Sequence, residues 1–247
     1  MKRLFVKPDQ ILNGVARLDR DQRHRLVKVL RMKNGDRVVL FDGNDRHLAE
    51  VSKNDAGKIE LVVTKKLKPE VPRVLDICLA QALIKAPRMD MVVEKATELG
   101  VSRIVPVVTE RSVPKGNMTG RIGRWNRIAQ SASAQCGRVD VPEIGAIRSF
   151  DEAILIDADL KTMLWEDELE AGAEKIIADG DGDKKKRAIN SIALLTGPEG
   201  GFTDEEVEKA VDGRWITWGL GALTLRAETA SIAGISILTH SLAGRFR

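Results

Sequence analysis

The pattern of apolar and polar positions divides the chain into two parts near residue 70. Before that point, short stretches in which apolar and polar residues alternate are separated by turn-forming residues, which is typical of β-strands. Residues 38–41, 47–51 and 59–64 show the pattern most clearly, and Asn34-Gly35 is a strong tight-turn sequence. Short strands at this spacing predict a small β-barrel. One helix is expected over residues 21–30, with a face of basic side chains.

After residue 70 the pattern becomes an alternation of strands and helices. The break falls at residues 69–72, Pro-Glu-Val-Pro. Strands are expected at residues 74–82, 104–108, 161–165, 191–196 and 215–220, and helices at residues 89–99, 120–136, 203–211 and 228–242. This alternation predicts a mostly parallel sheet with helices on both faces. We therefore expect an α/β protein with a small β domain at residues 1–70 and a larger domain at residues 71–247.

The charge is distributed unevenly between these two parts. Residues 1–70 hold 17 Lys and Arg against 10 Asp and Glu, a net charge of +7, whereas the remainder holds 23 against 26, a net charge of −3. A basic module joined to a nearly neutral one indicates a part that binds a polyanion and a part that carries chemistry. A solvated basic surface without a partner explains the charge equally well.

The remaining composition excludes several classes of protein. No apolar run reaches about 18 residues, so we expect no membrane span and no membrane partner. The two cysteines, Cys78 and Cys136, suit a reducing compartment, and we expect a cytoplasmic protein. The three histidines, His24, His47 and His240, lack the spacing of a zinc site, so no metal is expected.

Two glycine-bearing loops follow predicted strands and precede predicted helices. The first is Gly197-Pro198-Glu199-Gly200-Gly201, and Thr203 with Glu206 forms a capping box that begins the next helix. The second runs from Leu220-Gly221 to Leu225-Arg226. Two such loops at the ends of neighbouring strands predict a pocket lined by backbone, which glycine allows a small ligand to approach closely. A tight strand-to-helix turn remains the alternative explanation of the first loop alone.

Arg226 is the candidate functional side chain of the second loop. It stands at a helix entrance, where the helix dipole favours negative charge. A residue that breaks a local rule beside a candidate pocket indicates function. The alternative is a salt bridge to Glu199 or Glu228, and Glu228 itself is expected to cap its helix.

Segments throughout the chain carry a family resemblance. They are Gly197-Pro198-Glu199-Gly200-Gly201-Phe202, Leu220-Gly221, Leu225-Arg226, Glu228-Thr229-Ala230, Val29-Leu30-Arg31, Arg88-Met89-Asp90, Glu98-Leu99-Gly100-Val101 and Gln135-Cys136-Gly137-Arg138. Together they resemble the RsmE family, the ribosomal RNA small-subunit methyltransferases of the SPOUT superfamily. The chain departs from the family pattern at Ala222 and Ala227, where arginine and threonine are usual.

The resemblance implies a fold and a reaction. Residues 1–70 would form a PUA-like RNA-binding barrel, and residues 71–247 a SPOUT-type α/β domain with a C-terminal trefoil knot. The loops would bind S-adenosylmethionine, without a metal, and the enzyme would methylate N3 of a specific uridine in the decoding region of 16S ribosomal RNA on the small ribosomal subunit. Members of the family are homodimers. Two alternatives remain: a SPOUT methyltransferase for another RNA, or a non-catalytic ribosome-associated RNA-binding protein, which the departures at Ala222 and Ala227 favour.

The resemblance also assigns roles to residues. Cofactor contacts are expected from Leu195, Thr196, Gly197, Pro198, Glu199, Gly200, Gly201, Leu220, Gly221 and Leu225. Arg226 is expected to stabilise the negative charge that develops on the uracil, and Glu199 to accept the N3 proton if burial makes it a strong enough base. RNA contacts are expected from Arg3, Arg23, His24, Arg25, Lys28 and Arg31.

Overall fold

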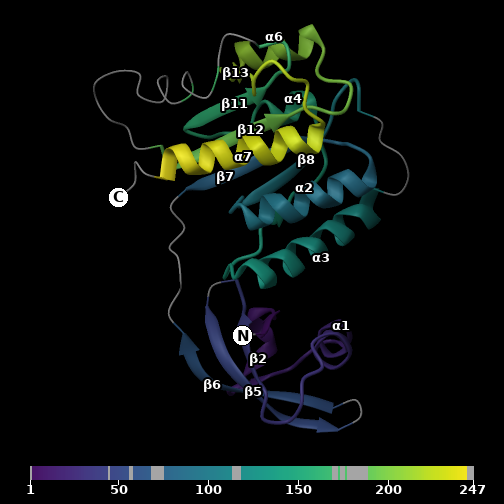
Figure 1. Ribbon diagram of the computed structural model, residues 1–247, viewed down its shortest axis with the longest axis vertical. Helices are drawn as coiled ribbons and strands as arrows, with labels where there is room; N and C mark the ends of the chain where they lie inside the picture. The colour runs from purple at the N-terminus through teal and green to yellow at the C-terminus, as the bar shows by residue number, and fades with distance from the viewer. Residues whose placement is uncertain are drawn as a thin grey trace. The chain divides into compact units, whose positions relative to one another are not determined.

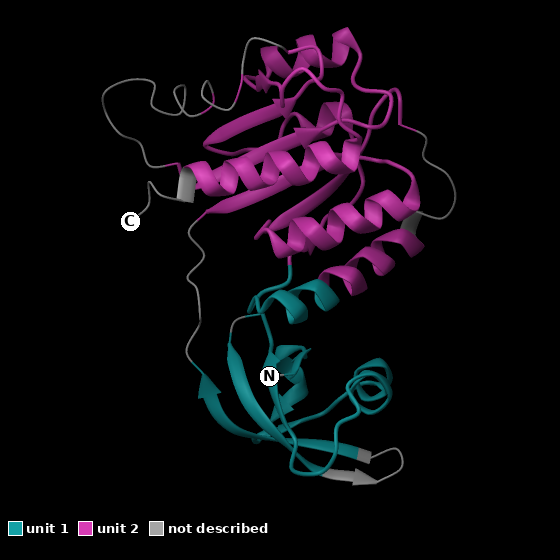
Figure 2. Ribbon diagram, in the orientation of Figure 1, with its two compact units in different colours: residues 1–72, 130–141 teal, residues 73–129, 142–247 magenta. Residues whose placement is uncertain are grey.

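The computed structural model describes residues 2–43, 45–55, 58–67, 75–112, 118–168, 172, 176 and 189–243. The chain forms two compact units, shown in different colours in Figure 2. One contains residues 1–72 and 130–141, and the other contains residues 73–129 and 142–247. The break expected at residues 69–72 lies outside the described residues.

The first unit is built on a six-stranded sheet in the order β1-β4-β5-β6-β3-β2. Its strands are β1 (Lys2–Phe5), β2 (Ile11–Leu12), β3 (Val15–Ala16), β4 (Arg37–Phe41), β5 (Arg46–Asp55) and β6 (Lys58–Leu67). β1 pairs parallel with β4, and the other pairs are antiparallel. Leu4, Leu40 and Leu61 are buried in its core, so the sheet hides the apolar positions of the alternating sequence.

The helix expected over residues 21–30 is present in a modified form. α1 (Arg20–His24) begins with a capping box, in which the side chains of Asp19 and Gln22 each accept the other's backbone N–H. It continues as a π-helical turn over Arg25–Val29. Leu26 is fully buried, whereas Val29 is 64% exposed.

Residues 130–141 cluster with the first unit although the sequence places them in the second domain. They comprise the end of α3 (Met118–Cys136) and the segment that follows it. Val139 accepts a backbone hydrogen bond from Gly43. Gly137 has φ +91°, and a Cβ there would overlap the guanidinium of Arg3. The chain therefore returns to the first unit through contacts that sequence periodicity does not register.

The second unit is an α/β fold around a parallel sheet in the order β10-β8-β7-β12-β11-β13, with β9 paired to β8. The strands are β7 (Asp76–Ala82), β8 (Arg103–Val108), β9 (Glu143–Ile144), β10 (Arg148–Ser149), β11 (Leu160–Leu164), β12 (Ser191–Thr196) and β13 (Ile216–Trp218). All their pairings are parallel. The central strands β7 and β12 are buried almost throughout, as strands covered on both faces are. The expected α/β architecture is confirmed.

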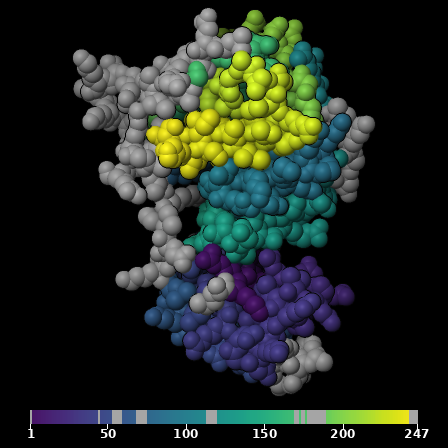
Figure 3. Space-filling view, in the orientation of Figure 1, coloured from purple at the N-terminus to yellow at the C-terminus, as the bar shows by residue number. Residues whose placement is uncertain are grey.

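Helices cover both faces of this sheet. They are α2 (Ala86–Glu98), the first part of α3, α4 (Phe150–Ala153), α6 (Asp204–Asp212) and α7 (Ala227–Ala243). α2 and α7 pack together and run side by side in Figure 1, and their atoms adjoin in Figure 3. Gly234 allows α7 to lie close to the sheet, since a Cβ there would come within 2.9 Å of Leu164 Cδ1. On the opposite face, Phe150 of α4 and Val207 of α6 pack against Leu195.

The strand order places the two glycine-bearing loops, which follow β12 and β13, at the same edge of the sheet. β11 lies between β12 and β13, and the three strands are parallel, so their carboxyl ends meet at the same edge of the sheet. None of the described helices is long and apolar enough to cross a lipid bilayer. The strand order does not test the trefoil knot, which stays a prediction.

Candidate functional site

A cavity of about 290 Å³ lies in the second unit at the carboxyl ends of β11, β12 and β13. Four segments and one residue of α2 line it: Leu164-Trp165-Glu166, residues 197–199 with Gly201, Trp218 with Leu220 and Gly221, residues 223–227 with Ala230, and Arg88. Small-molecule sites usually measure about 300–1,000 Å³, so the volume suits one small ligand. The crevice outside the carboxyl ends of parallel strands is the common ligand position in open α/β sheets.

The first loop needs its glycines for close approach. Gly201 has φ +70°, and a Cβ at this position would overlap the carboxylate of Glu166. A Cβ on Gly197 would lie 3.1 Å from the ring of Phe202. α6 begins directly after the loop, where Thr203 and Glu206 form the predicted capping box. The chain therefore turns from strand to helix while keeping its backbone open to the cavity.

The segment after β8 holds the first loop in place. Arg111 Nη1 donates to the carbonyl oxygens of Gly200 and Phe202, each at 3.0 Å. Glu206 Oε1 accepts the backbone N–H of Glu110 at 2.9 Å. No function was expected for Arg111, because an arginine that bonds the carbonyl oxygens of distant residues leaves no local sequence pattern.

The second loop is much more exposed. Gly221 has φ +103°, which favours glycine, and Leu223 is 81% exposed. Arg226 is exposed and lines the cavity, and its side chain makes no hydrogen bond or ion pair with the part of the chain that the structure describes. The salt bridges considered for Arg226, to Glu199 or Glu228, are not formed.

Arg88 of α2, rather than Arg226, forms ion pairs with the carboxylates of Glu199 and Glu228. Its Nη1 lies 3.5 Å from Glu199 Oε1, and its Nε lies 3.6 Å from Glu228 Oε1. Glu199 Oε1 also accepts the backbone N–H of Lys85 at 3.2 Å. Glu228 is buried, and its Oε2 has no hydrogen-bond partner among the described residues. One guanidinium therefore joins the start of α2 to the first loop and to the start of α7.

Most of the expected cofactor residues line the cavity. They are Gly197, Pro198, Glu199, Gly201, Leu220, Gly221 and Leu225, and the two expected catalytic residues, Arg226 and Glu199, lie there as well. Leu195, Thr196 and Gly200 are not part of its lining. Leu195 and Thr196 are buried beneath the loop, and Gly200 faces Arg111.

The expected RNA-contacting residues belong to the first unit, whereas the cavity belongs to the second. Arg23, His24, Lys28 and Arg31 are exposed, and Arg3 and Arg25 are half-buried. Five of the six belong to α1, the π-helical turn or the residues directly after it. The structure thus gathers them into one short basic segment, with Arg3 on the neighbouring strand.

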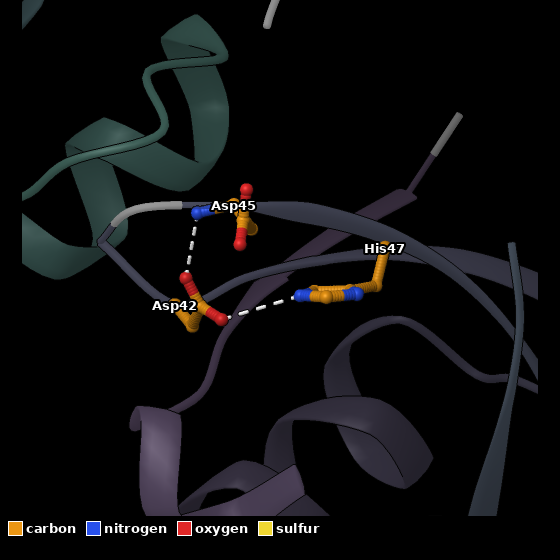
Figure 4. A group of neighbouring side chains, drawn as sticks. All are labelled: Asp42, Asp45 and His47. Atoms are coloured by element: carbon orange, nitrogen blue, oxygen red, sulfur yellow. Dashed lines mark hydrogen bonds and ion pairs between the residues drawn. The ribbon is translucent and has the colours of Figure 1, made fainter. Parts of the chain in front are cut away.

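The first unit also contains the one group of possible metal ligands found among the described residues, Asp42, Asp45 and His47 (Figure 4). Asp42 Oδ1 accepts the backbone N–H of Asp45 at 2.7 Å, and Asp42 Oδ2 lies 3.2 Å from His47 Nε2. Asp45 Oδ2 pairs with Lys66 at 2.6 Å. These contacts explain why the three side chains lie together, since they stabilise the connection between β4 and β5.

Comparisons with known proteins agree across the chain. A family model described as an RNA methyltransferase domain matches residues 71–239, and a model described as an RNA methyltransferase PUA domain matches residues 18–64. The ribosomal RNA small subunit methyltransferase E of Synechocystis sp. is 31% identical, covering 97% of this chain and 78% of the relative. That of Bacillus subtilis is 29% identical, covering 88% and 86%.

Two solved structures extend the likeness to the fold. A putative methyltransferase of Legionella pneumophila, in complex with the cofactor SAM, matches with a TM-score of 0.85 and 30% identity over 97% of both chains. A ribosomal RNA small subunit methyltransferase E of Neisseria gonorrhoeae, bound to S-adenosyl methionine, matches with a TM-score of 0.83 and 26% identity over 98% of both chains. Both likenesses span the two compact units.

Proposed function

This chain belongs to the RsmE family of RNA methyltransferases, and we propose on that basis that it transfers a methyl group from S-adenosylmethionine to 16S ribosomal RNA. The expected fold, a PUA-like domain before a parallel-sheet methyltransferase domain, is confirmed. The observation that carries the proposal is the cavity at the carboxyl ends of β11, β12 and β13, inside the region matched by the methyltransferase model.

The cavity lining fits this cofactor. Gly197 and Gly201 expose bare backbone at the cavity, where a Cβ would press on Phe202 or Glu166, and Trp165 and Leu225 offer apolar surface for a flat base. Carboxylates suit a sulfonium cation, and Glu166 and Glu199 supply two of them. Trp218 Nε1 is buried beside the cavity without a hydrogen-bond partner among the described residues. When bound, the cofactor supplies an electrophilic methyl group.

The chain's own residues must then activate the RNA base. We propose N3 of a specific uridine in the decoding region as the acceptor. That nitrogen carries a proton and is a weak nucleophile, so negative charge has to be stabilised on the uracil as the proton leaves. We propose Arg226 for this task, because its guanidinium is not used by other described side chains and lines the cavity.

Glu199 is the proposed proton acceptor. Its side chain is 31% exposed, and the contacts with Lys85 and Arg88 both use Oε1. Oε2 is therefore the oxygen that can take the N3 proton, once the bound substrate excludes water from the cavity.

The first unit is proposed to hold the RNA. We assign RNA binding to a domain of residues 1–70, with contacts from Arg3, Arg23, His24, Arg25, Lys28 and Arg31. Phosphate contacts by these cations would make affinity fall steeply with salt concentration. The target uridine has to leave its stack to enter the cavity of the domain at residues 71–247.

We further propose a homodimer in the cytoplasm, with a C-terminal trefoil knot in each subunit. Apart from Glu228 and His240, α7 carries no ionisable side chain, and Ile232 and Ile237 are only half-buried in the single chain. A second copy that covers these side chains would complete their burial. The molar mass in solution, measured by light scattering after gel filtration, tests this proposal directly.

Methyl transfer to small ribosomal subunits tests the whole assignment. Subunits from a strain that lacks this enzyme are incubated with labelled S-adenosylmethionine, and the modified nucleoside is identified by mass spectrometry. We expect N3-methyluridine in 16S ribosomal RNA. Cofactor binding without transfer would assign the enzyme to another RNA, and the absence of both would leave only an RNA-binding role.

A further inference from the structure

Three polar side chains are fully buried beneath the cavity. Gln81, Thr196 and Ser231 are 0%, 1% and 0% exposed, and they come from β7, β12 and α7. Thr196 directly precedes Gly197, and Ser231 stands one helical turn after Ala227. Because Gly197 and Ala227 both line the cavity, the three side chains connect the first loop to the start of α7.

Gln81 is the centre of this network. Its Oε1 lies 2.8 Å from Thr196 Oγ1 and 2.6 Å from Ser231 Oγ. Its Nε2 donates to the carbonyl oxygen of Ala82 at 3.0 Å and lies 3.5 Å from that of Gly197. This orientation of the amide is the one that works, since hydroxyl groups can donate to its oxygen whereas carbonyl oxygens accept only from its nitrogen.

The network joins the first loop to the start of α7. Gln81 and Thr196 are directly paired across β7 and β12, so the amide lies beside the residue that starts the first loop. Ser231 Oγ lies 2.8 Å from the carbonyl oxygen of Ala227 and 3.1 Å from Thr196 Oγ1. The start of α7 is thus joined to the end of β12 by groups that cannot shift without leaving a buried polar atom unpaired.

We infer that Gln81 is a positioning residue, which sets the distance between the first loop and the start of α7 and thereby the shape of the cofactor cavity. The inference rests on the proposed function, because it takes the cavity to be the S-adenosylmethionine site. The neighbours of Gln81 in β7, Leu79, Ala80 and Ala82, are apolar and fully buried. A buried position in this strand therefore does not require an amide side chain. The hydrogen bonds that link the first loop to the start of α7 do require one.

Gln81→Leu removes the acceptor for both hydroxyl groups. We expect the Kd for S-adenosylmethionine, measured by titration calorimetry, to rise roughly tenfold. The KM for S-adenosylmethionine should rise with it, while kcat at saturating cofactor changes less than threefold, because the reacting groups are untouched. Gln81→Glu keeps the acceptor oxygen and, when protonated, a donor. Its affinity should therefore approach that of the wild type at low pH and decline as the pH rises.

Thr196→Val and Thr97→Val form the matched pair that separates positioning from general stability. Thr97 is also fully buried, but its hydroxyl donates to the carbonyl oxygen of Val93 within α2 at 2.7 Å. Both variants should lower Tm by similar amounts, and only Thr196→Val should weaken cofactor binding, about threefold to tenfold.

The outcomes are distinct. Equal cofactor affinity in Thr196→Val, Thr97→Val and the wild type would overturn the inference, and this pair decides the matter even if Gln81→Leu does not fold. Equal weakening in both threonine variants would also overturn it, since the effect would then follow stability. Absence of S-adenosylmethionine binding by the wild-type chain would instead refute the proposed function.

Discussion

The two loops of the cavity are built in opposite ways. The first, residues 197–202, is fixed by side chains from elsewhere in the second unit, namely Arg88 on Glu199, Arg111 on two carbonyl oxygens and Glu166 against Gly201. The second, residues 220–226, has exposed side chains at Ala222, Leu223, Thr224 and Arg226, and no side-chain hydrogen bond of this loop occurs within the described residues. The first loop is therefore preorganised, whereas the second is exposed to solvent.

The difference suits the two loops to different binding partners. A fixed wall binds a cofactor of constant shape with little loss of conformational freedom. An exposed loop can adapt to a large substrate that arrives from solvent, and binding residues are commonly carried by such loops. We therefore propose that the first loop holds the cofactor, and that the second loop, whose Leu225 also lines the cofactor cavity, meets the RNA base through Arg226.

The largest expected effect falls on turnover through the open loop. Arg226→Ala should reduce kcat about 100-fold to 1,000-fold, as the loss of a group that stabilises developing charge does. The Kd for S-adenosylmethionine should change little, because the side chain braces no other described residue. Single-turnover methylation and calorimetry measure the two quantities. Arg226→Lys, which keeps the charge but not the planar guanidinium, should recover part of the rate, and near-normal turnover of Arg226→Ala would remove the residue from the mechanism.

A smaller effect is expected on the first loop, where cofactor binding rather than turnover should change. Gly197→Val places a branched side chain against the Phe202 ring, where a Cβ alone would lie at 3.1 Å. Overpacking of about 1–3 kcal/mol should shift the loop into the cavity and weaken cofactor binding about tenfold to 100-fold. Gly123→Val is the control, because a Cβ at Gly123 has nothing within 4 Å. An unchanged Kd in a folded Gly197→Val protein would show that the loop is not the cofactor wall.

The parts of this site that follow a local rule could be predicted from the sequence. Strand-to-helix loops rich in glycine, the capping box at Thr203 and the misplaced charge of Arg226 all leave signatures within a few residues. The same holds for the parallel sheet, whose central strands are almost wholly apolar. The pairing of residues 130–141 with the first unit had no such signature.

What the sequence missed depends on contacts between distant segments. Arg88 and Glu228 are 140 positions apart, and Gln81 and Ser231 are 150 positions apart, so no window along the chain contains both partners. A single buried glutamine in an apolar strand was the available clue at β7. Polar residues in such a strand have to find partners, and this rule could have marked Gln81 as a residue with a role.

Arg88→Met tests whether the first loop depends on its link, through Arg88, to the start of α7. It leaves the Glu228 carboxylate buried without its cation, although the partial exposure of Arg88 reduces the cost to about 1–2 kcal/mol. We expect a lower Tm and cofactor affinity weakened up to about tenfold. Arg88→Met with Glu228→Gln removes the unpaired charge and should restore much of both. A double variant no better than the single one would assign Arg88 a direct contact with substrate.

The smallest effect is expected at Ala222 in the second loop. Ala222 is exposed, so Ala222→Arg should alter the free energy of unfolding by less than about 0.5 kcal/mol and leave the Kd for S-adenosylmethionine unchanged. An added cation beside Arg226 should still tighten RNA binding at low salt and steepen the dependence of log K on log salt by about one phosphate contact. Filter binding across a salt series measures this slope, with Ala222→Gln as the uncharged control. Tighter RNA binding without loss of cofactor affinity would show that the second loop faces the substrate, whereas a weakened cofactor Kd would mean that it closes on the cofactor as tightly as the first.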